Sequence, residues 1–322
     1  MKKLLFILFI ILLGCKAKEI IPKENGKIDV IFCPEENCSS ELIKLINSAN
    51  IAIHCAFYNL NLKDIIYGLA NKSKNIDVKI IIDDKNYNKN IKGVRIDKKN
   101  HKMHNKFCVI DYKKVWTGSF NPTIRDNYYN NNDVIILESK YIAENYEAEF
   151  LELWHHIFSD GNKVKYPVIF LNNTKVENYF CPEDCTTALN RIVALIKDAD
   201  KTIYFMTFSF TSEDIADALL LNNKAKIKGI FERSQINKYS QYKRLKDFGL
   251  NVKLDTNPAN MHHKVFIIDN VIVITGSFNP TKSAITRNDE NILIIHSKDI
   301  ATEYIKEFEK LWYGNSTSKT FK

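Results

Sequence analysis

The stretch Met103-His104-Asn105-Lys106, followed by Asp111 and Gly118-Ser119-Phe120-Asn121-Pro122-Thr123, decides the fold because it occurs twice. The second copy reads Met261-His262-His263-Lys264, followed by Asp269 and Gly276-Ser277-Phe278-Asn279-Pro280-Thr281. Corresponding residues are 158 positions apart, and this register continues without a gap to Trp154 and Trp312. A chance match would not keep one offset over this length. The chain is therefore a duplication, and we expect its two half-sites to form one active site.

The residue types in the repeat suit cleavage of a phosphodiester. Cleavage without a metal requires a nucleophile for phosphorus, an acid for the leaving oxygen and fixed cations around the phosphoryl oxygens. Two histidines and two lysines supply these groups, and a spacing of two places each histidine and its lysine on one face of a strand. We expect four further polar side chains to bind the substrate phosphate: Ser119, Asn121, Ser277 and Asn279. No metal or other cofactor is expected.

The pattern H-x-K-x4-D followed by G-S-x-N, present twice, resembles the phospholipase D superfamily. The stretch from Met261 to Asn291 is particularly similar to small bacterial HKD endonucleases and to mitochondrial cardiolipin hydrolase. Those small relatives carry one motif per chain and dimerise to complete a site. Here the resemblance covers roughly residues 27 to 316, which implies a monomer that contains an internal pseudo-dimer.

The resemblance also implies roles for the site residues. One histidine attacks phosphorus to give a covalent phosphohistidine, and the other protonates the leaving group and then activates water. We predict His104 as the nucleophile and His262 as the acid and base. In the family a carboxylate holds the catalytic imidazole; Glu290 matches it, whereas Asn132 stands at the equivalent position of the first copy. This difference leaves the reverse order open, and it predicts different pKa values for the two histidines.

The catalytic set given by the motifs comprises His104, Lys106, Asp111, His262, Lys264, Asp269 and Glu290. Within it, we expect Asp111 and Asp269 to orient the adjacent lysine or turn rather than to react.

The N-terminus predicts export. Two lysines precede an apolar run from Leu4 to Leu13, and Gly14-Cys15 follows, as in a secretory signal peptide. The end of this run resembles a bacterial lipobox, in which Cys15 is lipidated; an uncleaved anchor is the alternative. Residues 16–26 then read as a polar tether. In either case we expect the protein to be membrane-tethered outside the cytoplasm.

Cysteine usage agrees with export. Four cysteines form two local pairs in similar contexts, namely Cys33 with Cys38 and Cys181 with Cys185. We expect two disulfides, as an oxidising compartment permits; four thiolates around one zinc ion are the alternative. Cys55 and Cys108 lie in apolar strand patterns, so we expect them to be buried free thiols.

The chain is expected to be an α/β protein built from two similar phospholipase D-like α/β/α sandwich halves. Each half has a central mixed sheet, and the halves pack as a pseudo-dimer. In each, an amphipathic helix, several buried strands and a long final helix succeed one another, which is typical of α/β layers. The expected division is a signal segment 1–15, a tether 16–26, a first half 27–158, a linker 159–165, a second half 166–316 and a tail 317–322.

A basic segment precedes the first motif. Between Asp83 and Lys102 we expect mostly loop, and its cations are either a solvated surface or a lip that gathers a polyanion: Lys85, Lys89, Lys92, Arg95, Lys98, Lys99 and Lys102. The corresponding part of the second half contains a predicted helix around 239–249.

Three functional classes remain open once the motifs, the resemblance and the composition are taken together. Hydrophobic residues make up 45% of the chain and aromatic residues 11%, which excludes a disordered protein. The net charge of +8 suits an anionic partner, either phospholipid or nucleic acid. The classes are a hydrolytic phosphodiesterase, a phosphatidyl transferase of the cardiolipin-synthase type and a non-catalytic binding module. Retention of both complete motifs favours the first.

Overall fold

The computed structural model describes residues 21–83, 94–97 and 102–314. The predicted signal segment, Cys15, the first part of the predicted tether, the predicted tail and most of the basic segment lie outside the described residues. No helix in the described part of the chain is both long enough and apolar enough to cross a bilayer.

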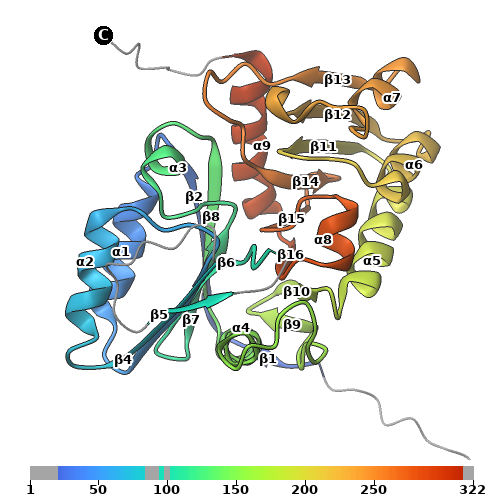
Figure 1. Cartoon of the computed structure of the whole chain (residues 1–322). Coiled ribbons are helices and arrows are strands. Elements are labelled where there is room, and N and C mark those ends of the chain that lie inside the picture. The colour runs from blue at the N-terminus through green and yellow to red at the C-terminus, as the bar shows by residue number, and fades with distance from the viewer. Residues whose placement is uncertain (1–20, 84–93, 98–101, 315–322) are drawn as a thin grey trace, which may run out of the picture.

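The first half is built on a seven-stranded mixed sheet (Figure 1). Its strand order is β2-β8-β7-β6-β3-β4-β5. The central strand β3 is a run of six buried residues that pairs in parallel with β4 and antiparallel with the motif strand β6. The strands are β2 (Lys27–Cys33), β3 (Ala52–Phe57), β4 (Asp77–Asp83), β5 (Val94–Asp97), β6 (Lys106–Ile110), β7 (Lys114–Gly118) and β8 (Asn132–Glu138).

The second half repeats this sheet and extends it to nine strands in the order β1-β9-β10-β16-β15-β14-β11-β12-β13. Its motif strand β14 again lies antiparallel to the central strand, here β11. The strands are β1 (Lys23–Glu24), β9 (Val168–Leu171), β10 (Thr174–Cys181), β11 (Thr202–Thr207), β12 (Lys226–Phe231), β13 (Asn251–Leu254), β14 (Lys264–Ile268), β15 (Ile272–Gly276) and β16 (Glu290–His296).

The helices form an outer layer on each sheet and a central layer between the sheets. In Figure 1, α1 and α2 cover the outside of the first sheet, and α5 and α6 cover the outside of the second. The long helices α4 and α9 lie on the inner sides, where α9 contacts both β15 of its own half and β2 of the other. The helices are α1 (Cys38–Ser48), α2 (Lys63–Lys72), α3 (Ile124–Tyr128), α4 (Lys140–Trp154), α5 (Cys185–Asp198), α6 (Glu213–Leu221), η2 (Arg233–Gln235), α7 (Tyr242–Asp247), α8 (Lys282–Thr286) and α9 (Lys298–Tyr313).

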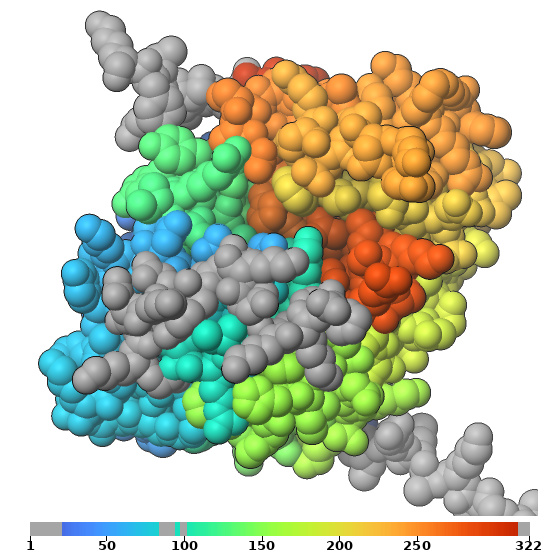
Figure 2. Space-filling view, in the orientation of Figure 1, coloured from blue at the N-terminus to red at the C-terminus, as the bar shows by residue number. Residues whose placement is uncertain are grey.

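The two halves share a hydrophobic core. One cluster of buried side chains includes Phe107 and Tyr146 from the first half and Phe180 and Tyr304 from the second, and two further clusters lie one in each half. The shared cluster fixes the two motif strands relative to each other. In the space-filling view, the surfaces of the two halves meet along the middle of the molecule (Figure 2). The predicted α/β pseudo-dimer is confirmed.

Several local predictions need correction. The predicted tether is too long, because Lys23 and Glu24 form β1, which pairs in parallel with β9 of the second half. The segment predicted to be mostly loop contains β5, whose four residues pair with β4. The sequence reasoning also missed β2 and β10, which carry the first cysteine of each local pair at their ends.

The prediction of free thiols at Cys55 and Cys108 is wrong, because these residues form a disulfide. They lie directly opposite each other on the antiparallel strands β3 and β6. A cross-strand pair 53 residues apart in sequence depends on strand register, which no local pattern reveals. The local disulfides, by contrast, are present as predicted: Cys33–Cys38 and Cys181–Cys185.

Candidate active site

Backbone pairing between the halves brings the two histidines into one site. The His104 N–H donates to the Asp289 carbonyl at 3.0 Å, and the His262 N–H donates to the Asn131 carbonyl at 2.8 Å. Each histidine therefore lies between its own motif strand and the loop that precedes the last strand of the other half. The positive charges of Lys264 and Lys106 act on the opposite histidine, His104 and His262 respectively, which places all four side chains in one electrostatic environment.

Each imidazole is held by a residue of the opposite half. His104 Nδ1 lies 2.8 Å from Glu290 Oε2, and His262 Nδ1 lies 2.8 Å from Asn132 Oδ1. Because the carboxylate and the amide oxygen can only accept, Nδ1 carries the proton in both rings. Nε2 is thus the nitrogen left for chemistry in each. The sequence predicted the contrast between Glu290 and Asn132 but not that each would serve the histidine of the other half.

The two lysines curl back onto their own motifs. Lys106 Nζ donates to the His104 carbonyl at 2.6 Å, and Lys264 Nζ donates to the His262 carbonyl at 2.5 Å. Both lysine side chains are buried. These bonds fix the two ammonium groups beside the histidines without using up all three donors of either group.

Burial and mutual repulsion favour the neutral forms of these four cations. Burial lowers the pKa of His104 to about 4, although Glu290 opposes the shift. Burial, followed by the charges of Lys264 and Lys106, lowers the pKa of His262 well below its ordinary value. Burial lowers the pKa of Lys106 to about 7, and burial together with Lys106 lowers that of Lys264. An anionic substrate relieves this repulsion, so the site is electrostatically prepared for a phosphate.

Ser119 and Ser277 bond to residues behind the histidines, so the phosphate-binding role given to them by the motif stays a prediction. Both side chains are fully buried. Ser277 Oγ donates to Glu290 Oε2 at 2.6 Å and accepts from the Asn291 N–H. Ser119 Oγ makes the equivalent bonds to Asp133 and, at 3.2 Å, to Asn132 Oδ1. The two hydroxyls thus bond to Glu290 and Asn132, which in turn bond to the two histidines.

Asn121 and Asn279 remain candidates for phosphate contact. They are 8% and 9% exposed, like the two histidines at 8% each. Asn121 Nδ2 donates to Asp126 Oδ2 at 2.8 Å, whereas Asn279 Oδ1 accepts from the Ser209 N–H at 3.3 Å. The two asparagines are thus presented through different partners.

Glycine is required at the start of each loop. Gly118 and Gly276 have φ values of +136° and +134°, and an added Cβ would lie 2.3 Å from the carbonyl oxygen of Asp133 or Asn291. Because glycine has no side chain, the neighbouring strand, β8 or β16, can pass close to the backbone at these positions.

Asp111 and Asp269 lie away from the histidines, at the other end of β6 and β14. Asp111 accepts from the backbone N–H groups of residues 50–52, and Asp269 from those of residues 200–202. Burial raises the pKa of each carboxyl, but these hydrogen bonds outweigh it and hold the pKa below its ordinary value. Both residues anchor the turn before the central strand and do not belong to the reacting set.

Sequence reasoning missed an aromatic ring beside each histidine. The Tyr58 ring lies 4.8 Å from the His104 ring, and the Phe208 ring lies 4.6 Å from that of His262. The same rings lie near the ammonium groups of Lys106 and Lys264, at 5.1 and 5.0 Å. Both follow the central strand of their half, a position that the repeat alignment could have revealed.

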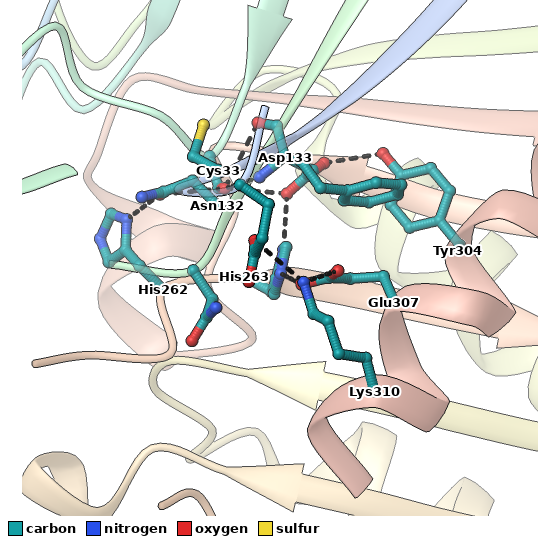
Figure 3. A network of polar contacts seen from close by, with 12 residues as sticks. Cys33, Asn132, Asp133, His262, His263, Tyr304, Glu307 and Lys310 are labelled. Atoms are coloured by element: carbon teal, nitrogen blue, oxygen red, sulfur yellow. Dashed lines mark hydrogen bonds and ion pairs between the residues drawn. The ribbon is translucent and has the colours of Figure 1, made fainter. Parts of the chain in front are cut away.

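A buried charged network behind His262 was also missed (Figure 3). His263 bonds to Asp133 through Nδ1 at 3.1 Å and to Glu307 through Nε2 at 3.2 Å. Burial lowers the pKa of His263, but the two carboxylates outweigh it and raise the pKa overall. Lys310 bonds to Glu307 and also to Glu35 of the first half. Asp133 follows Asn132 in sequence and bonds to His263, the neighbour of His262, so the network contacts this side of the site from both halves.

One group of carboxylates in the described structure has the spacing of metal ligands. Oxygens of Glu149, Glu152 and Glu183 lie within 4.8 Å of one another. This group lies behind the His104 motif, where Glu149 accepts from Asn105 Nδ2 at 3.0 Å, and it does not include a catalytic histidine or lysine.

Comparison with known proteins agrees with the duplicated site. A family model described as "Cardiolipin synthase, PLD-like domain" matches residues 42–154 and again residues 192–312. The two matched segments contain the two motifs.

Among curated proteins, the chain is 33% identical over 129 residues to a mitochondrial cardiolipin hydrolase of Chlamydomonas reinhardtii, covering 39% of this chain and 58% of that protein. It is 32% identical over 156 residues to a phospholipase D of Rickettsia prowazekii, covering 48% of this chain and 73% of that protein. The chain thus spans less than two thirds of the algal relative. Among solved structures, phosphatidylserine synthase of Haemophilus influenzae has the same fold, with a TM-score of 0.66, 15% identity and coverage of 88% of this chain and 86% of that one.

Proposed function

We propose that this chain, which belongs to the phospholipase D superfamily, hydrolyses phosphodiester bonds through a covalent phosphohistidine. The observation that carries the proposal is the cross-half pairing of the histidines. His104 with Glu290 and His262 with Asn132 present two Nε2 atoms from two halves of the chain, and two lysines accompany them.

In the proposed first step, His104 Nε2 attacks phosphorus and the bond to the leaving oxygen breaks. His262, protonated at Nε2, gives that proton to the leaving oxygen. In the second step, His262 takes a proton from water, the resulting hydroxide attacks phosphorus, and the bond between Nε2 and phosphorus breaks. His104 is then neutral and His262 is protonated again, so the enzyme returns to its starting state.

The difference between the two Nδ1 partners supports this order of roles. An imidazole phosphorylated at Nε2 keeps its proton on Nδ1 and carries a positive charge, which the Glu290 carboxylate stabilises. Burial raises the pKa of Glu290, but the charge and hydrogen bond of His104 outweigh it, so the carboxylate stays ionised. The amide of Asn132 carries no charge, so it would not stabilise a phosphorylated His262 in the same way.

The lysines and asparagines complete the proposed mechanism. Lys106 and Lys264 lie beside the histidines and stabilise the negative charge on the phosphoryl oxygens. Asn121 and Asn279 supply amide groups at the same place.

We propose a phospholipid as the substrate. The relatives named above as cardiolipin hydrolase and phospholipase D support this choice, and the predicted lipid anchor at Cys15 would hold the enzyme beside a membrane. Three disulfides support the proposed location outside the cytoplasm. Nucleic acid, which offers the same phosphodiester, is tested in parallel because the net charge of +8 suits either polyanion.

The test uses the purified chain with cardiolipin-containing vesicles, single-stranded DNA and RNA, each with and without a metal chelator. We expect chelator-resistant release of phosphatidic acid or phosphatidylglycerol. Cleavage of nucleic acid alone would exclude the lipid substrate. Loss of all activity in chelator would exclude the metal-independent mechanism, and added glycerol that diverts the product to a phosphatidyl ester would favour a transferase.

A further inference from the structure

Asp126 is a buried carboxylate beside His262 that no sequence motif identifies. It lies on α3, is 4% exposed, and its Oδ2 is 3.8 Å from His262 Nδ1. That distance is within ion-pair range but too long for a hydrogen bond. Its oxygens accept from the Asn121 N–H and Nδ2 at 2.8 Å each and from Asn130 Nδ2 at 2.5 Å.

The helix that carries Asp126 has a counterpart without this carboxylate. The equivalent residue of the second half is Ala284, 158 positions later, on the matching helix α8. The two helices have the same length and are capped in the same way, by the hydroxyls of Thr123 and Thr281. Since the second half forms the same capped helix with alanine, the helix itself does not require the aspartate.

In the second half the carboxylate belongs to Glu290 instead, and an equivalent asparagine donates to the carboxylate in each half. Asn288 Nδ2 donates to Glu290 Oε1 at 3.1 Å, and its counterpart Asn130 donates to Asp126 Oδ1. In the second half, the residue pair at positions 284 and 290 is alanine and glutamate. In the first half, the pair at positions 126 and 132 is aspartate and asparagine. Each half therefore directs one carboxylate, held by an equivalent asparagine, toward the opposite histidine.

We propose that Asp126 is the positioning residue that supplies His262 with the negative charge that Glu290 supplies to His104. The inference rests on the proposed function, because it assigns Asp126 to the acid and base steps of that reaction. His262 is a cation before it protonates the leaving oxygen and again after it takes the proton of water. Asp126 stabilises this cation across 3.8 Å while Asn132 fixes the ring through Nδ1.

The charged environment of His262 makes this contribution necessary. The groups that act against its protonation come from β6, β14 and the two histidine segments: Lys264, Lys106, His104 and His263. Asp126 also acts on the lysines: burial lowers the pKa of Lys106, and both Glu290 and Asp126 oppose that shift. Asp133, another buried carboxylate of the first half, is already bonded to His263, Thr275 and Tyr304.

The first experiment compares leaving groups in Asp126→Asn and in the wild type. Phosphatidylcholine has an alkoxide leaving group that needs a proton, whereas phosphatidyl-4-nitrophenol releases a weakly basic phenoxide that does not. We expect kcat for phosphatidylcholine to fall about 10- to 100-fold, whereas the first-turnover burst of nitrophenol, which precedes the base step, should slow less than about threefold. If only nucleic acid is cleaved, the same two leaving groups are compared on a thymidylate diester. An equal loss on both esters would overturn the proposal, because a distorted site slows both.

The second experiment restores the charge. Asn132→Glu places a carboxylate at the position equivalent to Glu290. The kcat of the double variant Asp126→Asn/Asn132→Glu is therefore expected to be at least about tenfold higher than that of Asp126→Asn. The basic limb of the pH profile of kcat, which moves to lower pH in Asp126→Asn because the cation is less stable, is expected to move back. A double variant as slow as the single one would contradict the assignment.

The third experiment does not depend on turnover. Histidine labelled at Cε1 is titrated by NMR in sulfate buffer, and the His262 signal is identified by its loss in His262→Gln. We expect Asp126→Asn to lower the pKa of His262 by about one unit, whereas the exposed control Asp299→Asn leaves it unchanged. An unchanged value in Asp126→Asn would overturn the proposal. If the wild type cleaves no phosphodiester but this shift is seen, the proposed function fails and the contact between Asp126 and His262 stands.

Discussion

The two halves share one backbone plan, yet the buried polar clusters behind their motifs carry different charges. Behind His262, the cluster contains two cations and three carboxylates: His263, Lys310, Asp133, Glu307 and Glu35. The equivalent residues behind His104 include no cation: Asn105, Glu152, Asn291, Glu149 and Glu183. The duplication has kept the positions while the charges at those positions have changed.

The hydrogen bonds show that the two clusters are otherwise equivalent. Thr275 and Tyr304 donate to Asp133, and their counterparts Thr117 and Tyr146 donate to Asn291. A cluster with cations behind His262 and a cation-free cluster behind His104 thus fill the same space. The comparison teaches that the site needs a satisfied network behind each histidine but not a particular charge in it.

The largest expected effect concerns the unequal roles of the two histidines. His104→Ala and His262→Ala are each expected to lower kcat by about 100- to 10,000-fold, because each removes a reacting nitrogen. With phosphatidyl-4-nitrophenol, which needs no acid, His262→Ala is expected to accumulate a phosphoenzyme that it cannot hydrolyse. Mapping of the modified residue by mass spectrometry, with the digest kept at neutral to alkaline pH because phosphohistidine is acid-labile, checks this. A phosphohistidine at position 262 in the His104→Ala variant would reverse the assigned roles.

The second prediction exchanges the charged pair His263 and Asp133 for the neutral pair of the cation-free cluster. His263→Asn alone leaves the buried Asp133 carboxylate without its cationic partner, and Asp133→Asn alone removes a partner of a buried imidazolium. Each single change is expected to cost about 3 to 5 kcal/mol of unfolding free energy. The double variant His263→Asn/Asp133→Asn reproduces the Asn105 and Asn291 pair of the first half, so most of the loss is expected to be recovered.

Urea denaturation of the four proteins gives this double-mutant cycle, and additive losses would show that the clusters are not interchangeable. The pH dependence has a defined sign. The pKa of His263 is raised, so its contribution is complete below its ordinary value of 6.5 and disappears as the pH rises through the raised value. The double variant is expected to lack this decline.

Much of the catalytic set could be predicted from the sequence because the duplication repeats it at one offset. The two histidines, the two lysines and the contrast between Asn132 and Glu290 were visible in this way. Their location on paired strands of similar α/β halves followed from the buried, alternating patterns. The repeat shows which residues are important, but it does not show which residue each of them contacts in the folded protein.

The errors concern contacts and residues that a comparison of the two motifs does not give. The comparison likewise does not show that Ser119 and Ser277 bond with the last strand of their own half. Cys55 and Cys108 are joined because of strand register. Asp126 occurs in only one copy, so a comparison of the motifs passes over it.

The third prediction adds a cation to the cation-free cluster. Glu152 stands at the position of Lys310, beside Glu149 and Glu183. Burial raises the pKa of Glu183 to about 7, and burial and then the charge of Glu183 raise that of Glu149. Because a raised carboxyl pKa means that the folded state holds the proton longer, stability falls as the pH rises from the ordinary value of 4.5 through about 7.

Glu152→Lys is expected to reduce this fall and to stabilise the protein at pH 8 by roughly 1 to 3 kcal/mol. Glu152→Gln removes the negative charge but keeps an acceptor for Asn162, so it serves as the control and should give a smaller gain. Urea midpoints measured between pH 4.5 and 8 check the prediction. A lysine variant whose stability still falls with pH as in the wild type would show that the two carboxyl groups do not sense position 152.

The smallest effect is expected from making the aromatic neighbours of the histidines identical. Tyr58 and Phe208 both present a ring near a histidine and a lysine, and they differ only by a hydroxyl. Tyr58→Phe keeps the ring that faces Lys106, so kcat is expected to stay within about threefold of the wild type. Tyr58→Ala removes the attraction between ring and ammonium, worth about 1 kcal/mol, and should lower kcat about fivefold or more. Steady-state kinetics with both variants separates the ring from the hydroxyl, and a large loss in Tyr58→Phe would show that the first half uses the hydroxyl for a task that the second half lacks.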